Sequence, residues 1–272
     1  TMPRMTFVTA PASRATDTGD RGYIMFIRML TGGLIAGVVA GLVAGALHFV
    51  FLQDIILEAE LYESGEKVHF DAAGQSGPSG ADGADHDAPG HDHGADHGAA
   101  GHDDGGVEWI GRNALTIVFG TIVYAGYGLM LAATLQGVRQ AGRRISASAG
   151  VLWGLAGYAT FQFVPAMGLP AELPGTISAG IGLRQTWWFA ATVATGVGLA
   201  IMVYGRTPVF VATGAVIIAA PHVIGAPQLD TMFGLAPPEL AAEFAVRGLG
   251  VGLVAWVILG WLTARLTRSD AA

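Results

Sequence analysis

The feature that most constrains this chain is the recurrence of apolar segments about as long as a bilayer is thick. Hydrophobic residues make up 52% of the 272 residues and charged residues only 13%, with a mean hydropathy of +0.50. About 20 apolar residues in a helix cross the hydrocarbon core. We therefore predict an all-α polytopic membrane protein, in which a disordered extension (residues 1–23) precedes a membrane domain (residues 24–272). Its six predicted transmembrane helices are 24–52, 110–135, 147–164, 184–204, 208–225 and 243–264.

The charged residues predict how these spans are oriented. Of the 21 acidic residues, 14 lie between Asp54 and Glu108, where Lys67 is the single base. Arginines instead precede the first span, occupy alternate connections and follow the last span. By the positive-inside rule this alternation places both termini in the cytoplasm and requires an even number of spans. We expect three hairpins, each running from the inside to the outside and back. The arginines are Arg4, Arg14, Arg21, Arg28, Arg139, Arg143, Arg144, Arg206, Arg265 and Arg268.

The first outer connection, residues 64–107, holds the densest group of metal ligands. Residues 81–104 read ADGADHDAPGHDHGADHGAAGHDD, with five histidines and seven aspartates among glycine and alanine. Imidazole nitrogen and carboxylate oxygen both bind divalent first-row metals. We predict a disordered outer loop that captures metal weakly and exchanges it rapidly; a solvated spacer with incidental histidines is the alternative. The predicted ligands are His86, His91, His93, His97 and His102.

Three polar side chains lie near the outer ends of the first, third and fifth predicted spans: His48, Gln162 and His222. A polar group in apolar sequence is costly unless it has a partner. Together they are a candidate layer that replaces the water around an entering cation; for each one alone, a hydrogen bond at a helix end is the alternative. We expect His222→Ala to impair uptake more than deletion of the loop. The carboxylates predicted above this layer are Glu58, Glu60 and Glu172.

Small residues predict how the helices pack. Gly33, Gly37, Gly41 and Gly45 form overlapping G-x-x-x-G steps, which leave one helix face without side chains. Gly150 and Gly154 repeat this spacing in the third span. Glu243 and Arg247 are four residues apart, so they share one face of the last helix.

Several functions are disfavoured. The chain has no cysteine, which excludes disulfides and thiolate chemistry. With one lysine it has no phosphate-binding G-x-x-x-x-G-K-[ST] loop, and H-E-x-x-H and G-x-S-x-G are absent. The arginines are scattered along membrane edges and the pI is about 5.5, which disfavours nucleic-acid binding. We expect no enzyme, no tightly bound cofactor, and no nucleotide or nucleic-acid partner.

Four motifs resemble those of the CbtA family of proposed cobalt transporter subunits: IILEAELYE (55–63), FQFVPAMGLPAELPGT (161–176), RQTWW (184–188) and PHVIGAP (221–227). The resemblance extends from Met25 onward. It implies a bacterial inner-membrane protein linked to cobalamin synthesis, which imports Co²⁺ beside a small single-span partner, CbtB. It also implies five spans, whereas the arginines predict six. Ni²⁺ and Zn²⁺ remain alternatives, because nitrogen and oxygen donors follow the same affinity series for most sites.

Two other functions stay open at this point. A membrane subunit that binds or senses metal without conducting it would use the same ligands. A structural subunit of a larger membrane complex would make the histidine-rich loop incidental.

Overall fold

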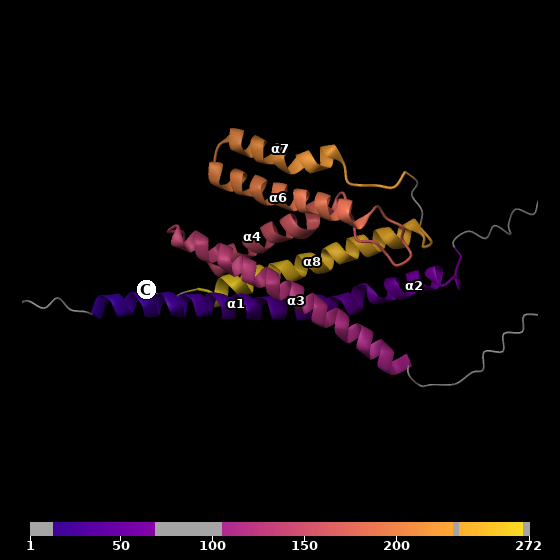
Figure 1. Cartoon of the computed structure of the whole chain (residues 1–272), viewed down its shortest axis with the longest axis horizontal. Coiled ribbons are helices and arrows are strands. Elements are labelled where there is room, and N and C mark those ends of the chain that lie inside the picture. Colours follow the sequence, from indigo (N-terminus) through magenta and orange to yellow (C-terminus); the bar gives the residue numbers. More distant parts are fainter. Residues whose placement is uncertain (1–12, 69–104, 231–233, 269–272) are drawn as a thin grey trace, which may run out of the picture.

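The computed structural model describes residues 13–68, 105–230 and 234–268, and within these ranges it is a helical bundle (Figure 1). Apart from the isolated bridge between Thr176 and Gly234, the described residues form no strand. The elements in chain order are α1 (Ser13–Phe51), α2 (Gln53–Glu63), α3 (Gly105–Gln140), α4 (Ala147–Tyr158), the π-helical turn η2 (Ala159–Phe163), α5 (Val164–Ala166), α6 (Ile181–Gly205), α7 (Pro208–Ile224) and α8 (Pro238–Leu266).

The apolar segments coincide with helices, as predicted, and the chain is a multi-pass membrane protein. The third predicted span corresponds to α4, η2 and α5, which follow one another without a break, and the fifth to the 17 residues of α7. Many large apolar side chains face outward, as lipid requires. Among the described residues, four helices are long and apolar enough to cross a membrane: Gly22–Phe51, Asn113–Gln140, Ile181–Gly205 and Pro238–Leu266.

The helix boundaries differ from the predicted ones in three places. Helix α1 begins at Ser13, so the second half of the predicted disordered extension (residues 1–23) is helical; residues 1–12 lie outside the described residues. Helix α1 ends at Phe51, within one residue of the predicted end of the first span, but the helix α2 that begins at Gln53 was not predicted. Helix α3 begins at Gly105, within the predicted loop 64–107, most of which lies outside the described residues. Hydropathy marks where a helix leaves lipid, and a helix can continue beyond that point into polar sequence.

The glycine stripe of α1 packs against α3, which confirms the predicted use of these residues. A Cβ atom added at Gly33 would lie 2.8 Å from the Cβ of Ala132, and one at Gly41 would lie 2.6 Å from the Cα of Thr121. Real side chains do not fit at such distances. The missing side chains therefore allow the two backbones to approach closely, and packing at close range is what holds helices together in lipid.

The other two predicted hairpins do not form pairs, because their helices exchange partners. Helix α4 packs against α8, and α6 packs against α7. Glycines lie on both sides of each contact: a Cβ added at Gly260 would lie 2.6 Å from the amide nitrogen of Gly154, and one at Gly198 would lie 2.7 Å from the carbonyl oxygen of Gly214. The close contacts therefore form between helices whose glycines face each other, whether or not these helices are consecutive in the sequence.

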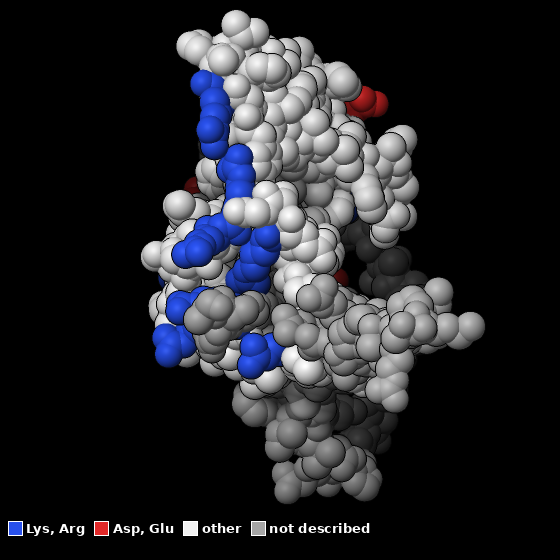
Figure 2. Space-filling view, turned by 90° about the vertical axis from the view of Figure 1, so that its left-hand side faces the viewer, with Lys and Arg blue, Asp and Glu red and all other residues white. Residues whose placement is uncertain are grey.

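Basic side chains gather at one end of the bundle, which we call the basic end (Figure 2). It lies at the left of Figure 1, where α3, α6 and α8 end and α4 and α7 begin. The opposite, acidic end contains α2 and the connections 167–180 and 225–237. The arginines of the basic end are Arg139, Arg143, Arg144, Arg206 and Arg265.

A small buried cluster ties the acidic end together. Ile55 and Ala59 of α2 pack with Leu173 of the first connection, and Leu240 and Phe244 of α8 cover them. Helix α2 is therefore fixed against both the connection 167–180 and α8.

Two arginines donate hydrogen bonds to backbone carbonyl oxygens at the C-terminal ends of helices. Arg247 donates to the carbonyl oxygen of Phe51 at the end of α1 (3.0 Å) and pairs with Glu243, which confirms the predicted pairing along one helix face. At the basic end, Arg139 donates to Thr267 Oγ1 (2.8 Å) and to the carbonyl oxygen of Thr267 (2.9 Å) beyond the end of α8. Each guanidinium thus meets the negative end of a helix dipole.

Candidate metal-handling site at the acidic end

Two of the predicted site residues, His48 and Gln162, line one cavity of about 180 Å³. His48 lies in the last turn of α1 and Gln162 in the π-helical turn, and the cavity is completed by α3 and α8. It lies near the acidic end, where α1 ends. The other lining residues are Ala44, Gly45, Leu52, Thr116, Gly120, Tyr124, Gly248, Val251 and Gly252.

Gln162 stands between this cavity and a second one. Its Nε2 donates to the carbonyl oxygen of Gly248 (3.3 Å), and Gln162 and Gly248 line both cavities. The second cavity, of about 240 Å³, lies beneath the connection 167–180 and is bordered by Trp188. The Gln162 amide can occupy its position because residue 252 is a glycine: any Cβ atom on Gly252 would collide with the amide. The amide thus forms the boundary between the two spaces.

The position of Gln162 depends on the π-helical turn. The amide of Val164 donates to the carbonyl oxygen of Ala159, five residues earlier, so the turn is wider than an α-helical turn. Pro165 follows and has no N–H with which to continue the α-helical ladder. Such widened turns frequently occur at functional sites. Here the turn places Gln162 opposite Gly252 of α8.

Four aromatic rings close the cavities on the side that faces the basic end. The ring of Trp256 lies 4.8 Å from that of Tyr127 and 5.8 Å from that of Phe161, and it is stacked on the latter. Tyr124 lies 5.9 Å from Tyr127 and lines the His48 cavity, while Phe161 lines the second cavity. We call these four residues the aromatic cluster. It fills the space between the cavities of the acidic end and a groove that opens near the basic end.

The predicted carboxylates lie at the acidic end, outside the two cavities. Glu172 pairs with Arg184 (2.8 Å), whose Nη1 also donates to Ser178 Oγ (2.8 Å). Glu58 pairs with Lys67 (3.2 Å), and both side chains are nearly half exposed. Glu60 follows two positions later on α2. An exposed ion pair of this kind contributes little stability, so its carboxylate can exchange partners with a passing cation.

His222 does not join His48 and Gln162. Its ring lies edge-on to Trp187 at 5.3 Å, and its buried Nε2 has no hydrogen-bond partner among the described residues. Trp187 in turn donates from Nε1 to the carbonyl oxygen of Pro221 (3.0 Å). The reason is the exchange of helix partners, because α7 packs on α6 and so does not border the His48 cavity.

The polar groups that line the His48 cavity include an imidazole, an amide, a phenol and a hydroxyl, and no carboxylate or guanidinium of the described residues lines it. Within the described ranges, no three His, Cys, Asp or Glu side chains form a group that could hold a metal. The five histidines of the predicted capture loop lie outside those ranges. A neutral donor set can replace part of a cation's water without holding the ion tightly, which suits passage better than storage.

The sequence did not indicate the aromatic cluster or the role of Gly248 and Gly252. Single tyrosines and glycines in apolar helices carry no signal of their own. Their spacing along α3 and α8 has meaning only once the partner helix is known.

Comparison with known proteins identifies the family of this chain. A sequence model of the family described as "Probable cobalt transporter subunit (CbtA)" matches residues 26–268. The chain belongs to the CbtA family. The match covers nearly the whole chain, so α1 to α8 together form the CbtA unit, and the predicted resemblance is confirmed. The family description makes the chain a probable cobalt transporter subunit. No match was found among curated proteins or solved structures.

Proposed function

We propose that this chain moves a divalent transition metal across the bacterial inner membrane, with Co²⁺ for cobalamin synthesis as the favoured ion and Ni²⁺ and Zn²⁺ as alternatives. One observation carries the proposal: in a member of the CbtA family, His48 and Gln162 share an intramembrane cavity that is closed by aromatic rings on one side. A cavity that offers polar groups such as His48 and Gln162 and is closed on one side is what alternating access to a cation requires.

The proposed topology has six spans, both termini in the cytoplasm and the acidic end in the periplasm. The 17 residues of α7 give a length of about 26 Å, and α4, η2 and α5 together reach about 30 Å, close to the thickness of the hydrocarbon core. The connections that would be cytoplasmic carry the arginines of the basic end, as the positive-inside rule requires.

The proposed route begins outside the described ranges. His86, His91, His93, His97 and His102 raise the local metal concentration, and Glu58, Glu60 and Glu172 draw the cation toward the connection 167–180. His48 and Gln162 then replace part of its water. The aromatic cluster closes the path in this conformation, so transport requires that these rings separate.

A small single-span CbtB-like subunit is the proposed partner. The described residues supply no nucleotide site, so the metal gradient or the partner drives the movement. No tightly bound cofactor is needed, because the metal is the cargo.

The test uses sealed vesicles that contain the purified chain, alone and with a CbtB-like subunit, loaded with a metal-sensitive dye. We expect Co²⁺ influx that His48→Ala lowers at least tenfold. Gln228→Ala, in the connection between α7 and α8, is the matched control and should transport normally. Metal binding without influx in either preparation would reject transport and support a non-conducting metal-binding subunit.

A further inference from the structure

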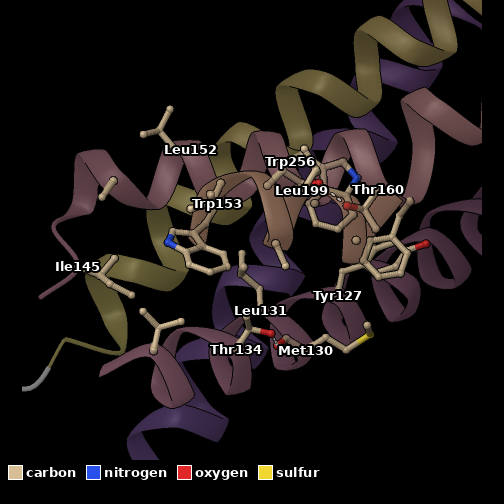
Figure 3. A pocket seen from close by; sticks show the side chains of 18 of the residues that line it. Tyr127, Met130, Leu131, Thr134, Ile145, Leu152, Trp153, Thr160, Leu199 and Trp256 are labelled. Carbon is tan, nitrogen blue, oxygen red and sulfur yellow. Dashed lines mark hydrogen bonds between the residues drawn. The ribbon is translucent and has the colours of Figure 1, made fainter. Parts of the chain in front are cut away.

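An apolar groove of about 510 Å³ lies on the basic-end side of the aromatic cluster (Figure 3). Its walls come from α3, α4, η2 and α6, helices that enclose it on several sides and leave it open on another. The side chains of Leu131, Ile145, Trp153 and Leu199 point into it. None of the proposed metal-handling residues lines this groove.

Two threonine hydroxyls in the apolar part of the groove are bonded within their own helices. Thr134 Oγ1 donates to the carbonyl oxygen of Met130 (2.9 Å), and Thr160 Oγ1 donates to that of Ala156 (2.7 Å). Each hydroxyl is thus bonded to its own helix, and the wall presents hydrocarbon. A ligand for this part must itself be apolar.

The end of the groove near the basic end is charged. Arg143 and Arg144 both line it, and the guanidinium of Arg143 lies 5.0 Å from the ring centre of Tyr204. Both arginines are exposed, and neither pairs with a carboxylate among the described residues. The groove therefore combines a hydrocarbon wall with two cationic groups at one end.

We propose that this groove binds one anionic glycerophospholipid, with its phosphate on Arg143 and Arg144 and an acyl chain against Trp153 and Leu131. Basic pockets between transmembrane helices bind anionic head groups in this way, and arginine recognises phosphate with two parallel hydrogen bonds. The proposal follows from groove shape and charge and does not rest on the proposed metal transport, although three residues of the aromatic cluster also line the groove. These residues are Tyr127, Phe161 and Trp256.

Two other occupants fit less well. A divalent cation is disfavoured because two guanidinium groups repel it and no His, Asp or Glu side chain of the described ranges lines the groove. A partner helix is too wide: a cylinder about 10 Å across would fill 510 Å³ within about 6 to 7 Å of its length, little more than one turn. A single acyl chain is narrower and can follow the wall.

Native mass spectrometry of the purified chain tests the proposal, with phosphatidylglycerol and phosphatidylcholine supplied in equal amounts. We expect one bound lipid, with at least a tenfold preference for phosphatidylglycerol. The double variant R143Q/R144Q should lower that preference to less than twofold. Arg206→Gln, which removes another arginine of the basic end outside the groove, should leave it unchanged.

A second measurement does not depend on the double variant. Trp153 lines the groove, so brominated acyl chains should quench its fluorescence. We expect brominated phosphatidylglycerol to quench the wild type at least twice as strongly as the brominated neutral lipid, and Trp153→Phe to remove this excess. Ala200→Phe, which fills the groove, should abolish lipid retention.

Three outcomes would overturn the proposal. The first is equal retention of the two lipids by the wild-type chain. The second is an unchanged preference in R143Q/R144Q together with equal quenching by the two brominated lipids. The third is a co-purifying polypeptide that Ala200→Phe displaces, which would assign the groove to a partner helix.

Discussion

At the scale of single residues, the Gln162 amide has the most consequential position in this chain. It lines two cavities, donates to a carbonyl of α8 and lies against a glycine that leaves room for it. A glutamine can both donate and accept, so it can turn its oxygen toward a cation and its nitrogen toward the backbone.

Replacing Gln162 with leucine keeps most of the volume and removes both polar atoms. We expect Co²⁺ influx into vesicles to fall at least fivefold, because the boundary between the two cavities becomes apolar. Stability should fall by only about 1 kcal/mol, the contribution of one ordinary hydrogen bond. Gln228→Leu serves as the control, and equal influx in both variants would remove Gln162 from the route.

The two membrane-embedded histidines should differ in importance. His48 lines the cavity, whereas His222 lies against Trp187 away from it. Contrary to the importance that sequence assigns to His222, we expect His222→Phe to retain at least half of the uptake and His48→Phe less than a tenth. Cellular cobalt content, measured at matched expression, compares the two variants. If His222→Phe loses more uptake than His48→Phe, the metal route lies along the α6–α7 pair instead.

At the scale of helices, glycine contacts hold the bundle together, and they are testable one helix at a time. Gly37 faces the backbone of Tyr124 and Ala125 on α3, whereas a Cβ at Gly126 on α3 would meet nothing within 4 Å. We expect Gly37→Val to destabilise the chain by at least about 3 kcal/mol. The added side chain would collide with the backbone of α3, which cannot move aside as a flexible side chain can. Gly126→Val should change stability by less than about 1 kcal/mol. Thermal unfolding in detergent measures both, and equal melting temperatures would exclude this close contact.

Arg139 links α3 to the end of α8. Arg139→Gln removes three charge-assisted hydrogen bonds to Thr267 and Ala264. We expect a loss of about 2 kcal/mol in unfolding free energy, because bonds to a charged donor contribute more than neutral ones and the helix end loses a cation. Arg139→Lys should restore about half. An unchanged melting temperature for Arg139→Gln would show that α8 is held by its glycine contacts alone.

The apolar helices and the pairing of α1 with α3 were predictable from the sequence, but the pairing of α4 with α8 and of α6 with α7 was not. Apolar length and glycine spacing are each properties of a single helix. The apolar segments and the α1 glycine stripe could therefore be found from the sequence. Pairing α4 with α8 depends on Gly150, Gly154 and Gly260 together, on helices separated by two others. The convergence of His48 and Gln162 depends on that pairing and on a π-helical turn, which a local sequence pattern does not reveal.

At the scale of the whole molecule, the separation of charge between its two ends makes sidedness measurable. The chain has no cysteine, so single cysteines can be introduced without background. We expect an impermeant maleimide to label Glu66→Cys and Gln228→Cys in intact cells, and Gln140→Cys only after the membrane is opened. This pattern follows from six spans with the basic end inside. Labelling of Gln140→Cys in intact cells would reject that topology.

The exchange of helix partners also bears on how the chain is made. Helix α4 leaves the ribosome before α6 and α7, yet among the described residues its glycine face is matched by α8, which is synthesised after both of them. Between those moments α4 has only lipid or the insertion machinery against that face. The packing of α4 is thus completed only after α8 has been synthesised. A ribosome that stalls before residue 238 leaves a chain in which α4 lacks the helix that its glycines fit.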